Sequence, residues 1–130
     1  MLIQLEQVVP YDSACIFLFK GDRQYAVAGR GFPNLEEVVG RDYSADDPLT
    51  AEIIETLRPV FIGNTRADAR MQGWGGTGNI KSWMGVPMII RGNIIGYVTL
   101  DSFTVGRYGQ AEADLAQNFA IQAAIAIHNA

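Results

Sequence analysis

The chain has few of the residues on which most catalytic and metal sites depend. It contains one cysteine, Cys15, and one histidine, His128, in 130 residues. A single cysteine excludes an internal disulfide and a metal site built from clustered cysteines. A single histidine near the end of the chain excludes most hydrolase triads and most histidine-ligated zinc or haem sites. We therefore expect no catalytic residue, no metal and no cofactor.

Positive charge and long apolar runs are also scarce. Lys and Arg number 10 against 14 Asp and Glu, for a formal net charge of −4. A nucleic-acid surface needs clustered Lys and Arg, so we expect no nucleic-acid partner. No apolar run approaches the roughly 20 residues that span a bilayer, and the first residues lack the basic start of a signal peptide. These absences favour a cytoplasmic module that does not insert into a membrane.

What the chain does have is a globular composition, with 48% hydrophobic residues and 18% charged residues. This balance is typical of a folded domain with its own core. The length suits a single domain, and the sequence shows neither an internal repeat nor a linker. We therefore expect one domain over residues 1–130.

Two apolar runs flank Arg91-Gly92-Asn93 and form the strongest pattern in the sequence. Both are rich in Val, Ile, Met and aromatic residues, which favour strands. Gly-Asn readily adopts the positive φ angles of a tight turn, so the pattern predicts an antiparallel hairpin. Residues 13–19 and 24–28 predict a second hairpin around Gly21-Asp22. Asp101, at the end of its strand, indicates a capping or turn role.

Helical patterns occur at both ends of the chain and once in its middle. Leu2, Leu5 and Val9 stand at helical spacing. Asp47-Pro48 predicts the start of a helix over residues 49–57, because Asp caps free N–H groups and Pro is tolerated at the first helical position. A short strand over 60–62 and an irregular, Gly-rich segment over 63–81 follow. Residues 109–129 predict one long helix.

The last helix has two apolar faces. We expect one face to pack on the sheet, through Leu115, Phe119, Ala123 and Ala126. The second face would remain exposed, and an exposed apolar face of this length usually has a partner. We therefore predict a homodimer through the terminal helices, with interface candidates Leu2, Leu5, Ala116, Ala120, Ala124 and Ile127. The alternative is a monomer in which this helix is fully buried.

The hairpin around Arg91-Gly92-Asn93 carries the resemblance to a known family. Ser82, Val86-Pro87 and Gly92, followed by Ile95-Gly96 and Ser102, are similar to the S-x-L-x-V-P-L … G-x-x-I-G-x-L-x-L-x-S hairpin of GAF domains. The order of predicted elements also resembles that family over essentially the whole chain. The matching motifs are structural, so they are evidence for the fold and say almost nothing about a ligand.

The resemblance implies an α+β, PAS-related sandwich with a central antiparallel sheet of about six strands. The terminal helices would lie on one face, and the short helix and irregular crossover on the other. It further implies a sensory input domain of bacterial signal transduction, cut from a longer protein. Such a domain binds a small molecule and relays through its terminal helices to an output domain in cis, such as a histidine kinase or a diguanylate cyclase.

The activities known in the family set further expectations. The Asn-Lys motif associated with cyclic-nucleotide binding is absent, since Asp101-Ser102 stands in its place. A bilin chromophore would need a Cys beside the pocket, whereas Cys15 lies in the first predicted strand and is expected to pack as a small hydrophobe. Methionine sulfoxide reduction requires several cysteines. We therefore expect neither bilin nor haem, and no enzymatic activity.

What remains is an unidentified small ligand. The candidate binding residues border the expected crossover pocket or carry polar groups on the apolar strands: Asp46, Asn64, Asp68, Arg70, Trp74, Ser82, Tyr97 and Thr99. Arg70 could pair with a carboxylate or phosphate, and Trp74 could stack on a planar or cationic ligand. The alternative is that Asp68 and Arg70 form a surface pair and Trp74 fills the core. On that view the chain is a ligand-free structural dimerisation domain of a signalling protein.

Overall fold

Six antiparallel strands form the centre of the molecule, in a computed structural model that describes residues 1–71 and 79–130. They lie in the order β3-β2-β1-β6-β5-β4, so β1 and β6 occupy the middle of the sheet. Their bounds are β1 Ser13–Lys20, β2 Arg23–Arg30, β3 Asp42–Ser44, β4 Val60–Ile62, β5 Ser82–Ile90 and β6 Asn93–Ser102.

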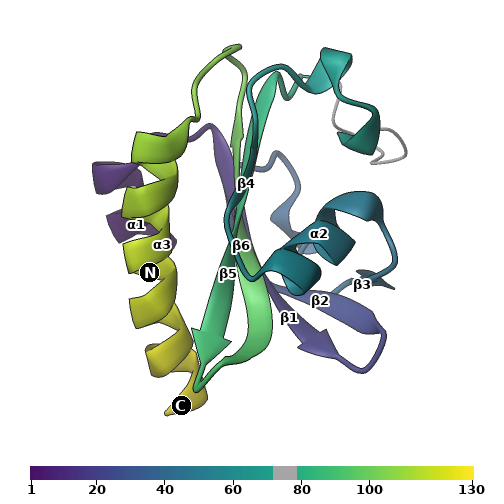
Figure 1. Cartoon of the computed structure of the whole chain (residues 1–130), viewed down its shortest axis with the longest axis vertical. Coiled ribbons are helices and arrows are strands. Elements are labelled where there is room, and N and C mark those ends of the chain that lie inside the picture. Colours follow the sequence, from purple (N-terminus) through teal and green to yellow (C-terminus); the bar gives the residue numbers. More distant parts are fainter. Residues whose placement is uncertain (72–78) are drawn as a thin grey trace.

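Helices cover both faces of the sheet (Figure 1). The terminal helices α1 (Leu2–Val8) and α3 (Gln110–His128) lie side by side on one face. The other face carries α2 (Pro48–Thr56) and the segment with two short 3₁₀ helices, Thr65–Ala67 and Ala69–Met71. A third 3₁₀ turn spans Leu35–Glu37. This arrangement confirms the predicted α+β sandwich.

The β5–β6 hairpin confirms the strongest sequence pattern but shifts its turn by one residue. Arg91 and Gly92 form the turn, with φ angles of 52° and 81°, and Asn93 is the first residue of β6. A two-residue turn with positive φ at both positions matches the twist of the flanking strands. Here those two positions are Arg91 and Gly92, so Asn93 lies in the strand rather than in the turn. The first hairpin forms as predicted, with β1 one residue longer and β2 three residues longer than expected.

The start of α2 confirms the predicted cap. The Asp47 carboxylate accepts a hydrogen bond from the Thr50 backbone N–H at 3.0 Å, and Pro48 is the first helical residue. The helix ends after Thr56, where Leu57 adopts a left-handed conformation with φ 55°. Capping of this kind is worth about 1 kcal/mol and fixes where the helix begins over the sheet.

The prediction for the face of α3 on the sheet was right for Ala123 and Phe119 and wrong for Leu115 and Ala126, which are exposed. The face on the sheet is the alanine face, and its buried residues are Ala113, Ala116, Ala120, Ala123 and Ala124. Leu115 points to solvent and is 47% exposed. Short alanine side chains let the helix lie close to the sheet, whose large side chains, such as Met84 and Met88, fill the interface.

The predicted dimer residues are corrected by the same observation. Leu2, Leu5, Ala116, Ala120 and Ala124 are at most 6% exposed and belong to the core between the terminal helices and the sheet. Ile127 is half-buried against that core. The five buried side chains already pack within one chain and present no surface to a second copy, whereas Ile127 stays a candidate.

At the edge formed by β2 and β3, the sequence predicted β2 but not β3. Strand β3 has three residues, all exposed, and such a short polar segment gives no periodic signal. Gly31, just after β2, has φ 88°, and a Cβ there would lie 2.1 Å from the Asp12 carbonyl oxygen. Glycine is therefore required where the chain leaves β2 and crosses the start of β1.

Candidate functional site

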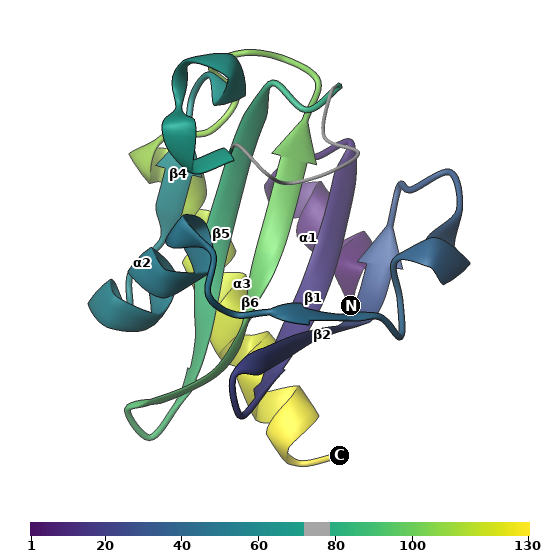
Figure 2. The same ribbon diagram turned by 90° about the vertical axis from the view of Figure 1, so that its right-hand side faces the viewer.

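The two faces of the sheet differ in polarity. The core between the sheet and the terminal helices is mostly apolar; its polar groups include tyrosine hydroxyls at its edge and the Gln117 side chain of α3, which donates to the Pro87 carbonyl oxygen at 3.0 Å and whose Oε1 is buried. The opposite core, under α2, contains Cys15, Phe17, Trp83 and Tyr97 among its large or reactive side chains. Figure 2 looks onto this side, with α2 over the β4–β5 end of the sheet. We call it the α2 face, and most buried polar side chains of the described residues lie on it or at its rim: Ser13, Gln24, Thr50, Thr65, Thr99 and Asp101.

A buried carboxyl group lies on the α2 face near the end of β6. Asp101 is 5% exposed, and it pairs directly with Ser13 of β1 and Trp83 of β5 in the strand register. The Ser13 hydroxyl donates a hydrogen bond to Asp101 Oδ2 at 2.8 Å. Burial raises the pKa of Asp101 from its ordinary 3.8 to about 7, against the opposing effect of the Ser13 hydrogen bond. The expected turn role was therefore wrong, because Asp101 is a strand residue with a buried side chain.

Next to Asp101 on the α2 face, the following set of cross-strand neighbours consists of small residues. Thr99 pairs with Cys15 of β1 on one side and Gly85 of β5 on the other. The Thr99 hydroxyl donates a long hydrogen bond of 3.5 Å to the Cys15 carbonyl oxygen. Burial, and then the nearby Asp101 charge, raise the pKa of the Cys15 thiol to about 12. The thiol is therefore protonated at neutral pH, and Cys15 packs as the small hydrophobe that the sequence predicted.

Tyr97 anchors the lower half of this face to α2. Its hydroxyl donates a hydrogen bond to the Gln24 side-chain oxygen and lies 3.2 Å from the Thr50 hydroxyl. Its ring stacks on Phe17, with centroids 5.1 Å apart. Gln24 in turn donates to the Asp47 carboxylate at 3.2 Å. Burial raises the pKa of Tyr97, so it is a neutral phenol. This network joins β2, β6 and the start of α2.

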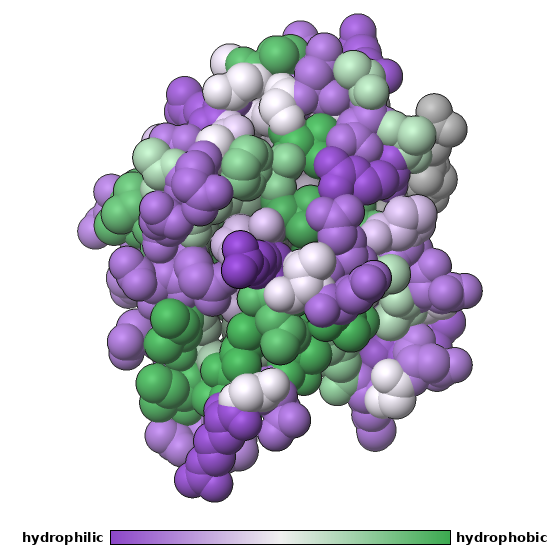
Figure 3. Space-filling view, in the orientation of Figure 1, coloured by the Kyte–Doolittle hydropathy of each residue, from purple (hydrophilic) through white to green (hydrophobic). Residues whose placement is uncertain are grey.

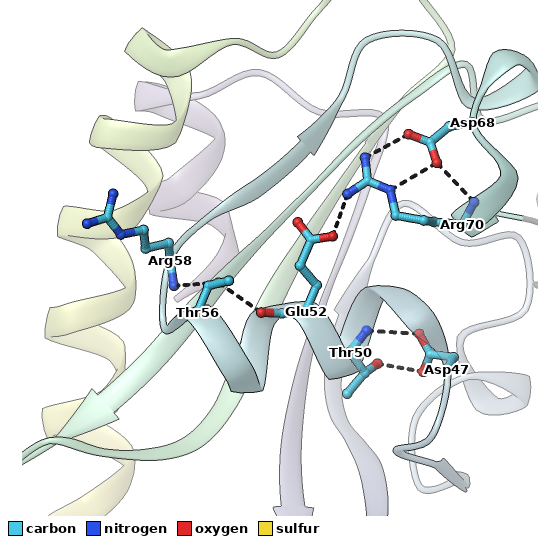
Figure 4. Close-up of polar contacts among 7 residues, drawn as sticks. All are labelled: Asp47, Thr50, Glu52, Thr56, Arg58, Asp68 and Arg70. Atoms are coloured by element: carbon cyan, nitrogen blue, oxygen red, sulfur yellow. Dashed lines mark hydrogen bonds and ion pairs between the residues drawn. The ribbon is translucent and has the colours of Figure 1, made fainter.

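Arg70 ties the 3₁₀ segment to α2 (Figure 4). Its guanidinium donates to the Asp68 carboxylate through Nε at 3.0 Å and Nη2 at 2.7 Å, and to Glu52 through Nη1 at 2.7 Å. Hydrogen bonds to Arg70 lower the pKa of Asp68, and hydrogen bonds to both carboxylates raise that of Arg70. The guanidinium therefore already holds two anionic partners, in agreement with the surface-pair alternative rather than with a free anion-binding group.

The other candidate residues are scattered. Asp46 and Asn64 are exposed, and the Asn64 side chain accepts a hydrogen bond from the Arg66 backbone N–H. The Ser82 hydroxyl donates to the Thr104 carbonyl oxygen at 2.7 Å, which supports the turn after β6. Trp74 lies outside the described residues.

The structure thus brings Tyr97 and Thr99 together on one face and pairs Asp68 with Arg70 above α2. Sequence reasoning missed Ser13, Gln24 and Thr50 and misjudged Asp101. A polar residue inside a predicted apolar strand could have marked a buried polar site, and Gln24 and Asp101 both have this pattern.

The described residues offer neither a metal site nor a membrane-spanning helix. Within residues 1–71 and 79–130, no group of three or more His, Cys, Asp or Glu side chains is arranged to hold a metal ion. In the same part of the chain, no helix combines the length and apolarity needed to cross a bilayer.

The fold is an α+β sandwich with a polar set of side chains on one face, and comparison with known proteins gives the family. The family model described as GAF domain matches residues 2–128, so the chain belongs to the GAF domain family. Domains of this family are typically regulatory or sensory input modules of signalling proteins. No curated protein matches the sequence.

Solved structures show the same fold at low sequence identity. One is a GAF domain/HD domain protein from Geobacter sulfurreducens, with TM-score 0.84 and 16% identity, covering 98% of this chain and 86% of that one. A free methionine-R-sulfoxide reductase from Thermoplasma acidophilum gives TM-score 0.80 and 15% identity, with the same coverages. A domain ascribed to a two-component sensor histidine kinase of Sinorhizobium meliloti 1021 gives TM-score 0.71 and 20% identity, again covering 98% and 86%.

Proposed function

We propose that this GAF domain is a sensory input module of bacterial signal transduction. It binds a small molecule on the α2 face and relays binding through α1 and α3 to an output domain in the same chain. A histidine kinase or a diguanylate cyclase is the kind of output that this arrangement serves. The module acts in the cytoplasm as a homodimer, without a cofactor.

The observation that carries this proposal is the different polarity of the two sheet faces. One face packs apolar side chains against the terminal helices. The other holds the hydroxyls of Ser13 and Thr99 and the carboxyl group of Asp101 among large apolar side chains. Small-molecule sites are mostly apolar with a few convergent polar groups, and the upper part of the α2 face has this composition.

A short hydrogen-bonded route links that face to the terminal helices. The Asp12 backbone N–H donates to the Asp101 carbonyl oxygen at 2.8 Å, and the Asp12 carboxylate accepts from the Phe103 N–H at 2.7 Å. Tyr11 next to it donates to the Leu2 carbonyl oxygen in α1, and Tyr108 before α3 donates to Pro10 at 3.0 Å. A shift at the end of β6 therefore has direct contacts through which to move both terminal helices.

The outward face of α3 supports the homodimer. Leu115, Ile121 and Ile125 are between 42% and 47% exposed. Residues 115–130 contain no Asp, Glu, Lys or Arg, which is unusual for a helix face in water. Figure 3 shows apolar surface over the lower part of α3 and the sheet beside it. In our proposal this outward face, not the buried alanine face, meets the second copy.

We further propose that the domain has no catalytic activity of its own. The reductase from Thermoplasma acidophilum shares the fold, but fold alone does not transfer an activity. Support comes from Cys15, whose buried, protonated thiol is a poor nucleophile and has no second cysteine with which to form a disulfide.

A specific observation favours a second candidate, the ligand-free dimerisation domain. A Cβ on Gly85 would lie 2.6 Å from the Trp83 ring and 2.7 Å from Ile53. Trp83 therefore fills the space between β5 and α2, and the Phe17–Tyr97 stack fills the space beside it. On this second view the α2 face is simply a core.

Native mass spectrometry of the protein purified gently from its own cytoplasm tests both candidates. A defined mass excess per subunit supports the ligand sensor, a ligand-free dimer supports the dimerisation domain, and a ligand-free monomer contradicts both. The double variant Leu115→Lys, Ile125→Lys should convert the dimer to a monomer. Val27→Lys, an equally exposed apolar side chain on β2, serves as the control and should leave the dimer intact.

A further inference from the structure

At one side the sheet ends in β4, which is much shorter than the strand beside it. β4 pairs with β5 only at Val60–Gly85, Phe61–Met84 and Ile62–Trp83. Beyond Gly85, β5 continues to Ile90 and pairs with β6 on its other side. Among the described residues, no strand lies against this half of β5 on the β4 side. We call residues 86–90 the open edge of β5.

The open edge is poorly suited to pairing with a further strand. Pro87 carries no backbone N–H, and its carbonyl oxygen already accepts the hydrogen bond from the Gln117 side chain at 3.0 Å. Proline and blocked backbone groups are common means of keeping an edge strand from pairing with another chain. A partner at this edge would therefore pack through side chains rather than extend the sheet.

Apolar side chains surround the open edge on both faces of the sheet. Figure 3 shows apolar surface that continues from the lower part of α3 across the sheet edge toward α2. β5 contacts both of these helices. The side chains are exposed on the helices and half-buried in β5, and we call these six residues the edge belt: Ile54 and Leu57 at the end of α2, Ile89 and Ile90 in β5, and Ile121 and Ile125 in α3.

Leu57 has a backbone conformation that leucine disfavours. Its φ of 55° lies in the left-handed region, where helices usually end on glycine or asparagine. A bulky side chain is strained there, and glycine would relieve the strain. The Leu57 side chain is 39% exposed and belongs to neither of the two cores of the described residues. Leucine at this position therefore adds strain and little burial within one chain, which indicates a contact with a partner.

The charge of the chain favours a second copy as that partner. The net charge is −4, whereas the edge belt contains no charged residue and residues 115–130 contribute none. In a twofold contact both copies present the same surface, so a neutral surface avoids the repulsion between acidic ones. Beside the belt, Glu55 and Arg58 are exposed and form no ion pair among the described residues. A second copy offers each of them the opposite charge.

We propose that the edge belt is a contact surface for a second copy of this chain. This inference rests on the homodimer of the proposed function and extends its interface from α3 over the open edge of β5 to the end of α2. Ile53 of α2 is buried in the core of the α2 face, next to the exposed Ile54. A displacement of α2 on that face therefore changes the dimer contact directly.

Sedimentation velocity of the full chain, over a series of micromolar concentrations, measures the Kd of the dimer and tests the proposal. Leu57→Gly removes the belt side chain and relieves the strain. We expect its dimer Kd to rise at least about tenfold. The Tm of the diluted monomer should stay close to that of the wild type, because the relief of strain offsets the lost packing. A leucine that served only the fold would lower this Tm and leave the Kd unchanged.

Ile54→Lys is the second variant, because it places a charge in the belt at an exposed helical position that should not disturb folding. It should also raise the Kd at least about tenfold. Val27→Lys is the matched control, since Val27 is 44% exposed and lies in β2 near the opposite edge of the sheet. This control should dimerise as the wild type does.

A wild-type Kd in both Leu57→Gly and Ile54→Lys would overturn the edge belt. If Leu115→Lys then weakens the dimer, the homodimer through α3 stands without the belt. An equal loss of affinity in Val27→Lys would also overturn the assignment, because the effect would not be specific to this edge. A wild type that stays monomeric throughout the series contradicts both the belt and the homodimer.

Discussion

Asp101 makes the stability of this domain depend on pH in a direction that is unusual for a carboxyl group. In the folded state its pKa is about 7, whereas in the unfolded chain it returns to the ordinary value of 3.8. The folded protein therefore binds a proton more strongly than the unfolded chain. Stability from this group is fully present below about pH 4 and is lost as pH rises through about 7.

The magnitude follows from the two pKa values. A difference of about 3 corresponds to roughly 4 kcal/mol over the whole titration. Between about pH 5 and pH 8 the domain should lose roughly 2.5 kcal/mol of unfolding free energy, because most of the proton is released there. For a domain of this size, that loss corresponds to a fall in Tm of about 10 °C.

Urea unfolding at a series of pH values from about 5 to 8 measures this loss directly, with linear extrapolation at each pH. The variant Asp101→Asn should be nearly independent of pH over that range and, at about pH 8, at least as stable as the wild type. Asp22→Asn should retain the wild-type slope, since its carboxylate is exposed.

Two results would refute this reasoning. One is a wild-type stability that stays constant or rises between about pH 5 and pH 8, because Asp101 would then be ionised in the fold without cost. The other is an unchanged slope in Asp101→Asn, which would assign the titration to another group.

Three further predictions concern single contacts. Ser13→Ala removes the donor that lowers the pKa of the buried carboxyl group, so the loss of stability with pH should become steeper, and an unchanged titration would contradict the hydrogen bond. Gly96→Ala places a Cβ 2.0 Å from a β1 carbonyl oxygen and should cost at least about 3 kcal/mol, while Gly63→Ala, with no atom within 4 Å, should cost less than about 1 kcal/mol by the same urea measurement. Arg70→Gln should cost about 1 kcal/mol in low salt and less in high salt, because its ion pairs are partly exposed, whereas exposed Arg66→Gln should cost nothing measurable.

Local patterns predicted most of the elements correctly. The hairpins followed from alternating apolar strands around short turns, and the α2 start followed from Asp47-Pro48. These features depend on neighbours within a few residues, so they can be predicted from the local sequence. The hairpin of β5 and β6 was also sufficient to indicate the family that the comparison then showed.

The face of α3 could not be assigned from its own sequence. Both faces are apolar, so periodicity predicts a buried face without choosing between them. The choice depends on the sheet, where Met84, Val86 and Met88 supply bulk and leave room only for alanine. The error for Leu2 and Leu5 has the same origin, because their burial depends on α3 and the sheet lying beside them.

The sequence by itself determined the elements, their order and the antiparallel hairpins, because these result from short-range periodicity and turn chemistry. The tertiary structure alone decided which polar groups meet. Ser13 and Asp101 are 88 residues apart in sequence and hydrogen-bonded in the sheet, and Gln24 reaches Tyr97 across 73 residues. It also decided the ionisation of Asp101, since burial raises its pKa and burial is a property of the assembled fold rather than of any segment.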